Sequence, residues 1–330
     1  IRSGIGHNEA GLRSMAPKFW FDKSVYHQLV KNEFDLDEFI RKQWYGEWKI
    51  IRNEPYPEQW DTFVSSAGGA YFFAPHEVNK ENLLREGYPE DRVIITGNSV
   101  VDAMKLVKKP DISIFEQYPV LEEYDTWIRV DIHRRGNLVE SRFKAIVEGI
   151  TKLVKNGQPV VWVELVATRE ALNFYNLREK ILRLSEKYKN FLFTPLWKSY
   201  GNVIEFWESR KCIAEFTDSG SIQEELNELN DVLCLTARFN TDRPETIFDA
   251  HSNVLVPPVS GDTIFSLINH IMNSDEIQAT MKKSKRIYGT NVGEKIITFL
   301  MNEMNKDALT FRWVHQRLWD LGNEKSPTFL

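Results

Sequence analysis

The chain has 330 residues, of which 42% are hydrophobic and 27% are charged. This composition is ordinary for a globular protein, and the length fits two domains. The net charge of -5 gives no general electrostatic case for nucleic acid or an anionic membrane as partner. No apolar run approaches the roughly 20 residues that cross a bilayer. Cys212 and Cys234 lie in apolar surroundings, which predicts buried thiols in a cytoplasmic protein and neither a disulfide nor a metal site.

The chain opens on a glycine-containing motif without a methionine, "IRSGIGHNEAGLRS", so we expect further sequence before Ile1. Residues 15–56 are rich in aromatic and charged residues and lack strand–helix alternation. We interpret them as a helical segment inserted in the first domain. The segments 70–75 and 92–98 read as short strands, and 76–87 between them as a helix that ends at a glycine.

From residue 125 onward, buried strands alternate with amphipathic helices. This alternation predicts a parallel sheet with helices on both faces, the Rossmann-like form of an α/β fold. The motif Lys108-Lys109-Pro110 is the predicted linker. It gives the boundaries 1–109 and 110–305, with a helical tail at 306–330. The predicted strands are 125–133, 159–166, 190–196, 212–218, 231–237 and 253–258, and the predicted helices are 139–157, 169–188, 200–211, 221–230 and 310–322.

A small, hydroxyl-rich turn joins the strand at 212–218 to the following helix. Ligands of parallel sheets bind past the carboxyl ends of strands, and a helix N-terminus attracts anions. Ser219, Gly220 and Ser221 could therefore hold a phosphate, while Glu225 one turn later could accept hydrogen bonds from ribose hydroxyls. An alternative of equal weight is that Ser219 is only a helix cap in a capping box.

The strand at 125–133 ends in "HRRG". A histidine beside Arg134 and Arg135 suits a pyrophosphate leaving group, since arginine supplies a fork of charged donors and His133 can transfer a proton. The alternative is a solvated basic loop that contains an ordinary histidine.

Three further charged residues are candidates. Glu9 follows a short strand and Glu58 follows a proline; two carboxylates near one sugar carbon could act as general base and general acid. Each could equally be a solvated glutamate. Arg243 could reach a phosphate or a sugar hydroxyl, or could form an ion pair with Asp242 or Glu245.

Taken in order, these motifs resemble one family, the UDP-N-acetylglucosamine 2-epimerases. The resemblance runs from Gly6 to about Pro257. It implies the GT-B architecture of two Rossmann-like domains with parallel sheets, with the nucleotide sugar in the cleft between them. It also implies that the first domain is incomplete at its N-terminus. The segments that carry it are "GHNEAGLRS", "PE" at 57–58, "FFAPHEVNKENLLREG", "VIITGNSVVDA", "HRRGN", "TDSGSIQEE" and "TDRPET".

The resemblance also implies residue roles. The chemistry that the resemblance implies is elimination of UDP to a glycal with proton abstraction at sugar C2, after which UDP, or water in the hydrolysing branch, adds back. It implies no redox cofactor, and a homodimer. Arg135 and Ser221 also belong to the predicted UDP-sugar site, but they are inferred from the arginine pair and the hydroxyl-rich turn described above. The implied catalytic groups are Glu9, Glu58 and His133, and the implied UDP ligands are Ser219 and Gly220 for the phosphates, Glu225 for the ribose and Arg243 in the same pocket.

The sequence departs from the family pattern around the substrate. Gly136 stands where the family has glutamate, Ser221 replaces a glycine, and Asp61 and Thr62 replace an asparagine and an arginine. The family's first phosphate-binding loop and a further catalytic aspartate have no counterpart. These changes suggest a UDP-sugar site with altered chemistry or an altered sugar.

Two other functions fit the same pattern. One is a GT-B glycosyltransferase that moves a sugar from UDP to an unknown acceptor, which Trp20, Trp44, Tyr45 and Trp48 in the insertion could receive by stacking. The simpler interpretation is that these rings pack the insertion onto its domain. The other is a member that binds UDP-sugars without turning them over.

Overall fold

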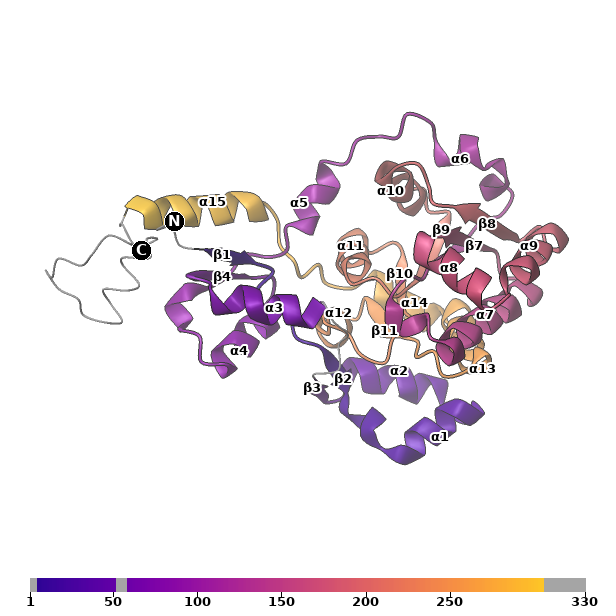
Figure 1. Ribbon diagram of the computed structural model, residues 1–330, viewed down its shortest axis with the longest axis horizontal. Helices are drawn as coiled ribbons and strands as arrows, with labels where there is room; N and C mark the ends of the chain where they lie inside the picture. The colour runs from indigo at the N-terminus through magenta and orange to yellow at the C-terminus, as the bar shows by residue number, and fades with distance from the viewer. Residues whose placement is uncertain (1–4, 52–57, 306–330) are drawn as a thin grey trace, which may run out of the picture. The chain divides into compact units, whose positions relative to one another are not determined.

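The computed structural model describes residues 5–51 and 58–305 and divides into two compact units (Figure 1). The smaller unit contains Ile1–Arg13, Tyr56–Ala103 and Tyr288–Leu330, and the larger contains Ser14–Pro55 and Met104–Ile287. Each unit is built on a parallel sheet, as the sequence predicts. Among the described residues no helix combines the length and the apolar character needed to cross a membrane.

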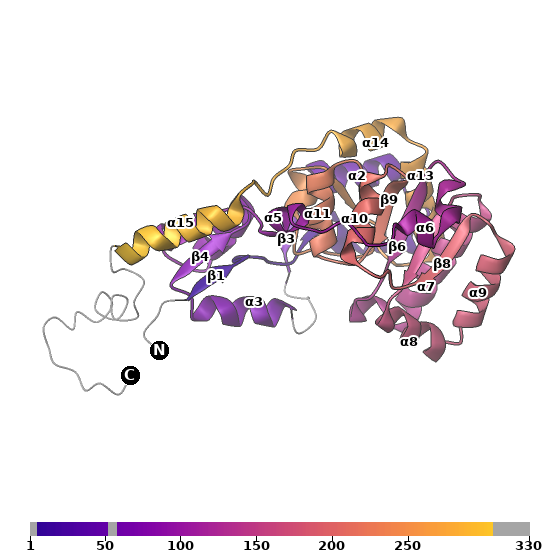
Figure 2. The ribbon, with the colours of Figure 1, turned by 90° about the horizontal axis from the view of Figure 1, so that it is seen from above.

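The smaller unit is a three-stranded parallel sheet between helices. Its strands are β1 (Gly6–Asn8), β4 (Tyr71–Ala74) and β5 (Val93–Ile95), in the order β1-β4-β5. Alternate side chains of β4 point to opposite faces, so Tyr71 and Phe73 pack against α15 (Val292–Asn305) while Phe72 contributes to a second cluster with Leu83 of α4 (Glu77–Arg85). Figure 2 shows α15 and α3 (Glu58–Ala67) on opposite sides of this sheet.

The larger unit is built on a six-stranded parallel sheet in the order β11-β10-β9-β6-β7-β8. Its strands are apolar along most of their length because both faces are covered by helices. They are β6 (Trp127–Asp131), β7 (Val160–Glu164), β8 (Phe191–Pro195), β9 (Cys212–Thr217), β10 (Leu233–Thr236) and β11 (Asn253–Leu255).

Two hydrophobic clusters lie on the two faces of this sheet. Val130 and Phe216 belong to the cluster beneath α7 and α13, whereas Trp127 and Cys212 belong to the cluster beneath α10 and α11. The α/β organisation predicted for this region is therefore confirmed. The helices are α6 (Ile114–Gln117), α7 (Glu140–Lys155), α8 (Val166–Phe174), α9 (Arg178–Lys187), α10 (Tyr200–Glu208), α11 (Ser221–Leu229), α12 (Glu245–Phe248), α13 (Gly261–Met272) and α14 (Asp275–Lys282).

The segment predicted as an insertion packs on the larger unit. It holds α1 (Lys23–Lys31), α2 (Leu36–Tyr45) and an antiparallel pair, β2 (Met15–Pro17) with β3 (Trp48–Ile50). Asp22 and Asp35 cap the two helices by accepting hydrogen bonds from Ser24 N and Glu38 N, both at 2.8 Å. Most tryptophan rings of the segment are used for packing, because Trp20 stacks on Phe39 and Trp44 is buried, whereas Tyr45 is exposed.

The boundaries between the units differ from the predicted ones. Ser14–Pro55 belongs to the larger unit and α15 to the smaller, since each buries its apolar side chains there. The predicted linker lies inside the larger unit, where a Cβ on Gly201 of α10 would come 2.5 Å from the Lys108 carbonyl oxygen. The single helix predicted at 169–188 is two helices, interrupted at Asn176, which has a φ of 55°. The helix predicted at 310–322 lies outside the described residues.

Candidate functional site

Asp218, in the turn after β9, organises the carboxyl edge of the large sheet. Its buried carboxylate accepts hydrogen bonds from the backbone N–H groups of His133 and Arg134 and from Asn137 Nδ2, each at 3.0 Å. The Asp218 carbonyl oxygen accepts two further bonds from Arg238, at 2.8 and 2.5 Å. The loop after β6 and the turn after β9 are therefore fixed against each other, as the ends of adjacent parallel strands allow.

The predicted phosphate turn forms the N-terminus of α11. Gly220 is its N-cap residue, with no side-chain cap, and Ser219 Oγ lies 3.4 Å from Ser221 Oγ. The alternative of a simple Ser219 capping box is therefore wrong. A Cβ on Gly220 would lie 3.2 Å from Arg134 Nη2 and 3.5 Å from Arg243 Cζ. Two guanidinium groups thus stand beside a helix N-terminus, an arrangement that favours a bound anion.

Arg243 also forms the ion pairs that the sequence offered as its alternative role. Its Nε donates to Glu224 Oε1 at 2.9 Å, and its Nη1 donates to Asp242 Oδ2. Burial alone would raise the pKa of Asp242, but the charges of Arg243, Arg238 and Arg134 outweigh burial and lower it. Asp242 therefore stays ionised and holds these guanidinium groups together, so the pairing positions Arg243 beside Gly220.

Glu225 lies one turn into α11 and is 6% exposed. The Tyr200 hydroxyl of α10 donates a hydrogen bond to its carboxylate, and Oε2 has no hydrogen-bond partner among the residues that the structure describes. Burial raises the pKa of Glu225 to about 7. A buried carboxylate oxygen without a partner is costly, and a ligand hydroxyl would satisfy it.

His133 follows β6 and lies between two carboxylates. Its Nδ1 is 2.9 Å from Asp131 Oδ1 and 3.4 Å from Asp218 Oδ1. The hydrogen bond to Asp131 raises the pKa of His133 above its ordinary value, against the effect of burial. These three residues also bring ligand-capable atoms within 4.8 Å of one another. Both carboxylates already accept hydrogen bonds from the protein, so we attribute the cluster to hydrogen bonding.

In the smaller unit, Glu9 lies just past the carboxyl end of β1. It is half-buried and has a left-handed φ of 55°, which residues other than glycine seldom adopt and which clusters at functional sites. Gly11 follows with a φ of 83°, and a Cβ there would lie 2.1 Å from the Asn79 carbonyl oxygen. The turn that carries Glu9 is therefore tightly fixed. Glu58 begins α3, and its side chain lies outside what the structure describes.

Of the two arginines that the sequence offered for a pyrophosphate, Arg134 lies against Gly220, whereas Arg135 is exposed, as is Ser221. The sequence interpretation missed Asp131 and Tyr200. Asp131 could have been found from its position two residues before His133, because alternate residues of a strand share a face. Tyr200 could not be found in this way, since its hydrogen bond to Glu225 joins two separate helices, α10 and α11.

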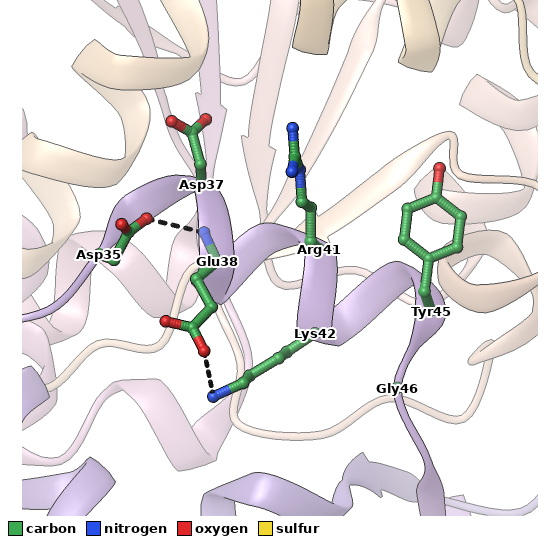
Figure 3. A pocket seen from close by; sticks show the side chains of 7 residues that line it. All are labelled: Asp35, Asp37, Glu38, Arg41, Lys42, Tyr45 and Gly46. Carbon is green, nitrogen blue, oxygen red and sulfur yellow. Dashed lines mark hydrogen bonds and ion pairs between the residues drawn. The ribbon is translucent and has the colours of Figure 1, made fainter.

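A separate surface hollow of about 370 Å³ lies along α2 (Figure 3). Its side chains are exposed and pair along the helix, with Asp35 accepting from Glu38 N at 2.8 Å and Lys42 Nζ 2.7 Å from Glu38 Oε1. It shares no residue with the anion site, and we assign it no ligand. It is lined by Asp35, Asp37, Glu38, Arg41, Lys42, Tyr45 and Gly46.

The parallel sheets, with an arrangement that favours a bound anion at a strand's carboxyl edge and a buried carboxylate beside it, define the class of α/β proteins built on parallel sheets. A family model described as UDP-N-acetylglucosamine 2-epimerase matches residues 52–301. The chain therefore belongs to the UDP-N-acetylglucosamine 2-epimerase family. A curated UDP-N-acetylglucosamine 2-epimerase of Methanocaldococcus jannaschii is 32% identical over 253 residues, which are 74% of this chain and 64% of that enzyme. The chain thus spans less than two thirds of the length of that relative.

Solved structures of the family share the fold. The M. jannaschii UDP-GlcNAc 2-epimerase in complex with UDP-GlcNAc and UDP is 26% identical, with a TM-score of 0.64 over 91% of this chain and 69% of that one. The Neisseria meningitidis enzyme bound to UDP-GlcNAc is 25% identical, with a TM-score of 0.66 over 91% of this chain and 70% of that one. The expected GT-B-like fold is confirmed.

Proposed function

We propose that the protein inverts C2 of UDP-N-acetylglucosamine by elimination and re-addition of UDP. A base removes the C2 proton while the C1–oxygen bond breaks, which gives UDP and a glycal. A proton then returns to the other face of C2 and UDP re-forms the bond at C1. Family membership supports this proposal, and so do the two solved relatives that hold UDP-GlcNAc.

The observation that carries the proposal is the spacing of the anion site and Glu225. Arg134 and Arg243 stand beside Gly220 at the N-terminus of α11. Glu225 lies four residues after Ser221, about 6 Å along the helix axis. A diphosphate at the helix N-terminus would place a ribose beside the Glu225 oxygen that lacks a partner among the described residues. An anion site and a hydroxyl acceptor at this distance suit a nucleoside diphosphate.

The remaining roles follow the family resemblance. His133 assists departure of the diphosphate, and Glu9 and Glu58 carry the proton at C2. Ser219 and Ser221 add hydroxyl donors to the phosphate site. We also propose, from the two cysteines in apolar surroundings, that the protein is cytoplasmic. On the resemblance alone we propose that it is a homodimer, needs no redox cofactor and supplies sugar nucleotides for polysaccharide synthesis. The transferase alternative has less support, because Trp20, Trp44 and Trp48 of the inserted segment pack against the core of the larger unit, while Tyr45 is exposed.

Proton NMR of the full-length protein with UDP-N-acetylglucosamine in D2O tests the proposal. Deuterium at sugar C2 together with a manno product is the expected result. Glu9→Gln, Glu58→Gln and His133→Gln should each lower turnover by about 100-fold or more, the usual contribution of a positioned acid or base. UDP binding should change little in the two glutamate variants.

The matched control is Glu77→Gln, which changes an exposed glutamate of the same unit and should leave turnover unchanged. An unaltered sugar spectrum despite measurable UDP binding would overturn the epimerase proposal in favour of a different sugar or a binding role. Full turnover in Glu9→Gln or Glu58→Gln would overturn that residue's catalytic role alone.

A further inference from the structure

His133 is held by a carboxylate of its own strand. Asp131 Oδ1 lies 2.9 Å from His133 Nδ1, and Asp131 is 8% exposed. An ionised carboxylate only accepts hydrogen bonds, so the hydrogen of this contact lies on Nδ1. The proton that distinguishes imidazolium from neutral imidazole is then the one on Nε2.

Asp131 is kept ionised by a buried cation behind it. Arg129 Nη2 lies 3.5 Å from Asp131 Oδ2, and Arg129 Nη1 donates to Glu215 Oε1 at 2.5 Å. Burial raises the pKa of Glu215 to about 7, so Glu215 takes up a proton before Asp131 does. Burial would also raise the pKa of Asp131, but the bond with His133 and the charge of Arg129 outweigh it and lower that pKa. Asp131 is therefore the carboxylate beside Arg129 that stays ionised and accepts the hydrogen bond from His133.

The second carboxylate near His133, that of Asp218, binds the backbone of the histidine. Asp218 Oδ1 accepts from the His133 backbone N–H at 3.0 Å and lies farther from the ring, at 3.4 Å. It fixes the main chain of the loop, while Asp131 fixes the imidazole. The charged groups that face the ring are therefore Asp131 from β6, Asp218 from the turn after β9 and Arg134 from the loop itself.

We propose that Asp131 is a positioning residue for His133. It holds the imidazole in the Nδ1–H form and favours the imidazolium, so that Nε2 carries a proton to the departing diphosphate. This inference rests on the proposed function for the catalytic use of that proton. The hydrogen-bonded pair itself does not depend on the reaction, so the two ideas can be tested separately.

Nitrogen-15 NMR of the histidine-labelled full-length protein tests the pair without reference to activity. The chain has seven histidines, so the His133 signal can be assigned by its loss in His133→Gln. We expect the Nδ1–H form in the wild type. We expect the His133 pKa to fall by about 1 unit or more in Asp131→Asn, the usual effect of removing an opposite charge within hydrogen-bond distance.

The pH profile of turnover provides the second readout. If protonated His133 is the acid, activity falls as pH rises through its pKa. The alkaline limb of the Asp131→Asn profile should therefore move to lower pH by the same amount as the NMR pKa. Asp262→Asn is the control, because it neutralises an exposed aspartate of the same unit that pairs with Lys152 and should move neither readout.

Each outcome decides one point. An Nε2–H form in the wild type would overturn the positioning role even if Asp131→Asn failed to fold, and so would an unchanged His133 pKa in that variant. Full turnover in His133→Gln would instead overturn the catalytic role of the histidine and leave the measured pair intact.

Discussion

Gln43 of α2 forms two hydrogen bonds with the backbone of Leu255 in β11. Its Oε1 accepts from Leu255 N at 2.7 Å and its Nε2 donates to Leu255 O at 3.1 Å. Trp44 Nε1 adds a bond to Asn253 O at 3.1 Å. Because β11 is an edge strand of the six-stranded sheet, these side chains occupy backbone groups that would otherwise be unpaired. The inserted segment thus protects the edge of the six-stranded sheet.

Gln43→Met keeps the volume of the side chain and removes both bonds to Leu255. Leu255 is fully buried, so its N–H and C=O would be left unpaired at about 1–3 kcal/mol each. We expect the free energy of unfolding of the larger unit to fall by about 3 kcal/mol in urea denaturation. Gln28→Met changes an exposed glutamine of α1 and should cost little. Equal stability of the two variants would refute the edge-protection role.

Replacing each arginine of the "HRRG" loop by glutamine tests which of the two contacts the phosphates of UDP. Arg134 lies against Gly220, whereas Arg135 is exposed. Arg134→Gln should weaken UDP binding at least about tenfold, since a hydrogen bond between charged groups contributes roughly 1.5–3 kcal/mol. Arg135→Gln should change affinity less than about threefold. Isothermal titration calorimetry with UDP measures both, and the reverse order would mean that Arg135 is the phosphate ligand.

Glu225 should make substrate binding depend on pH. Burial raises its pKa to about 7, and the ionised carboxylate is the better acceptor for ribose hydroxyls. The affinity for UDP-N-acetylglucosamine should therefore rise about fivefold from pH 6 to pH 8 relative to Glu225→Gln, which cannot ionise. This nucleotide sugar is suitable because its own phosphates do not titrate in that range. Glu228→Gln on the same helix should retain the wild-type pH dependence; parallel curves for wild type and Glu225→Gln would exclude a ribose contact.

Glu215 predicts a pH dependence of stability. Its folded-state pKa is raised from 4.5 to about 7 by burial, so between those values the folded state binds more protons than the unfolded state. Stability from this group is full below pH 4.5 and is lost as pH rises towards 7. Glutamine does not titrate, so the stability of Glu215→Gln lacks this pH dependence. The loss in free energy of unfolding of Glu215→Gln relative to wild type should therefore be smaller at pH 8 than at pH 5, by on the order of 2 kcal/mol.

Urea denaturation at the two pH values measures this difference. Glu208→Gln, at the exposed end of α10, is the control and should show a difference from wild type that does not vary with pH. A cost of Glu215→Gln that is the same at pH 5 and pH 8 would show that Glu215 is ionised throughout this range in the folded protein.

The strands and helices of the larger unit were predictable because their signals are local. The strand at β6 and the helix α7 follow from an apolar run and from apolar spacing of three and four residues, and the turn at Ser219 follows from small polar residues between strand and helix. Asn176 marks the limit of this approach. Its left-handed conformation ends one helix before another begins, and the apolar spacing continues through it.

The placement of the inserted segment could not be predicted in the same way. Its aromatic rings fit either a ligand or a packed interface. The choice depends on partners such as Leu255, which lies 212 residues from Gln43 in the sequence. Such contacts leave no local pattern. For the same reason the sequence placed residues 15–56 in the first domain, whereas the structure groups Ser14–Pro55 with the larger unit and α15 with the smaller one.

The sequence by itself determined the α/β class, the family resemblance and the residue types of the site, because strand ends, glycine turns and charged motifs each depend on residues that are adjacent in the sequence. Only the tertiary structure decided that Arg134 faces Gly220, that Asp131 and Asp218 divide the support of His133, and that Tyr200 holds Glu225. These relationships join separate strands and helices. Their geometry depends on how the sheet packs against α10 and α11, which a linear pattern of residues does not contain.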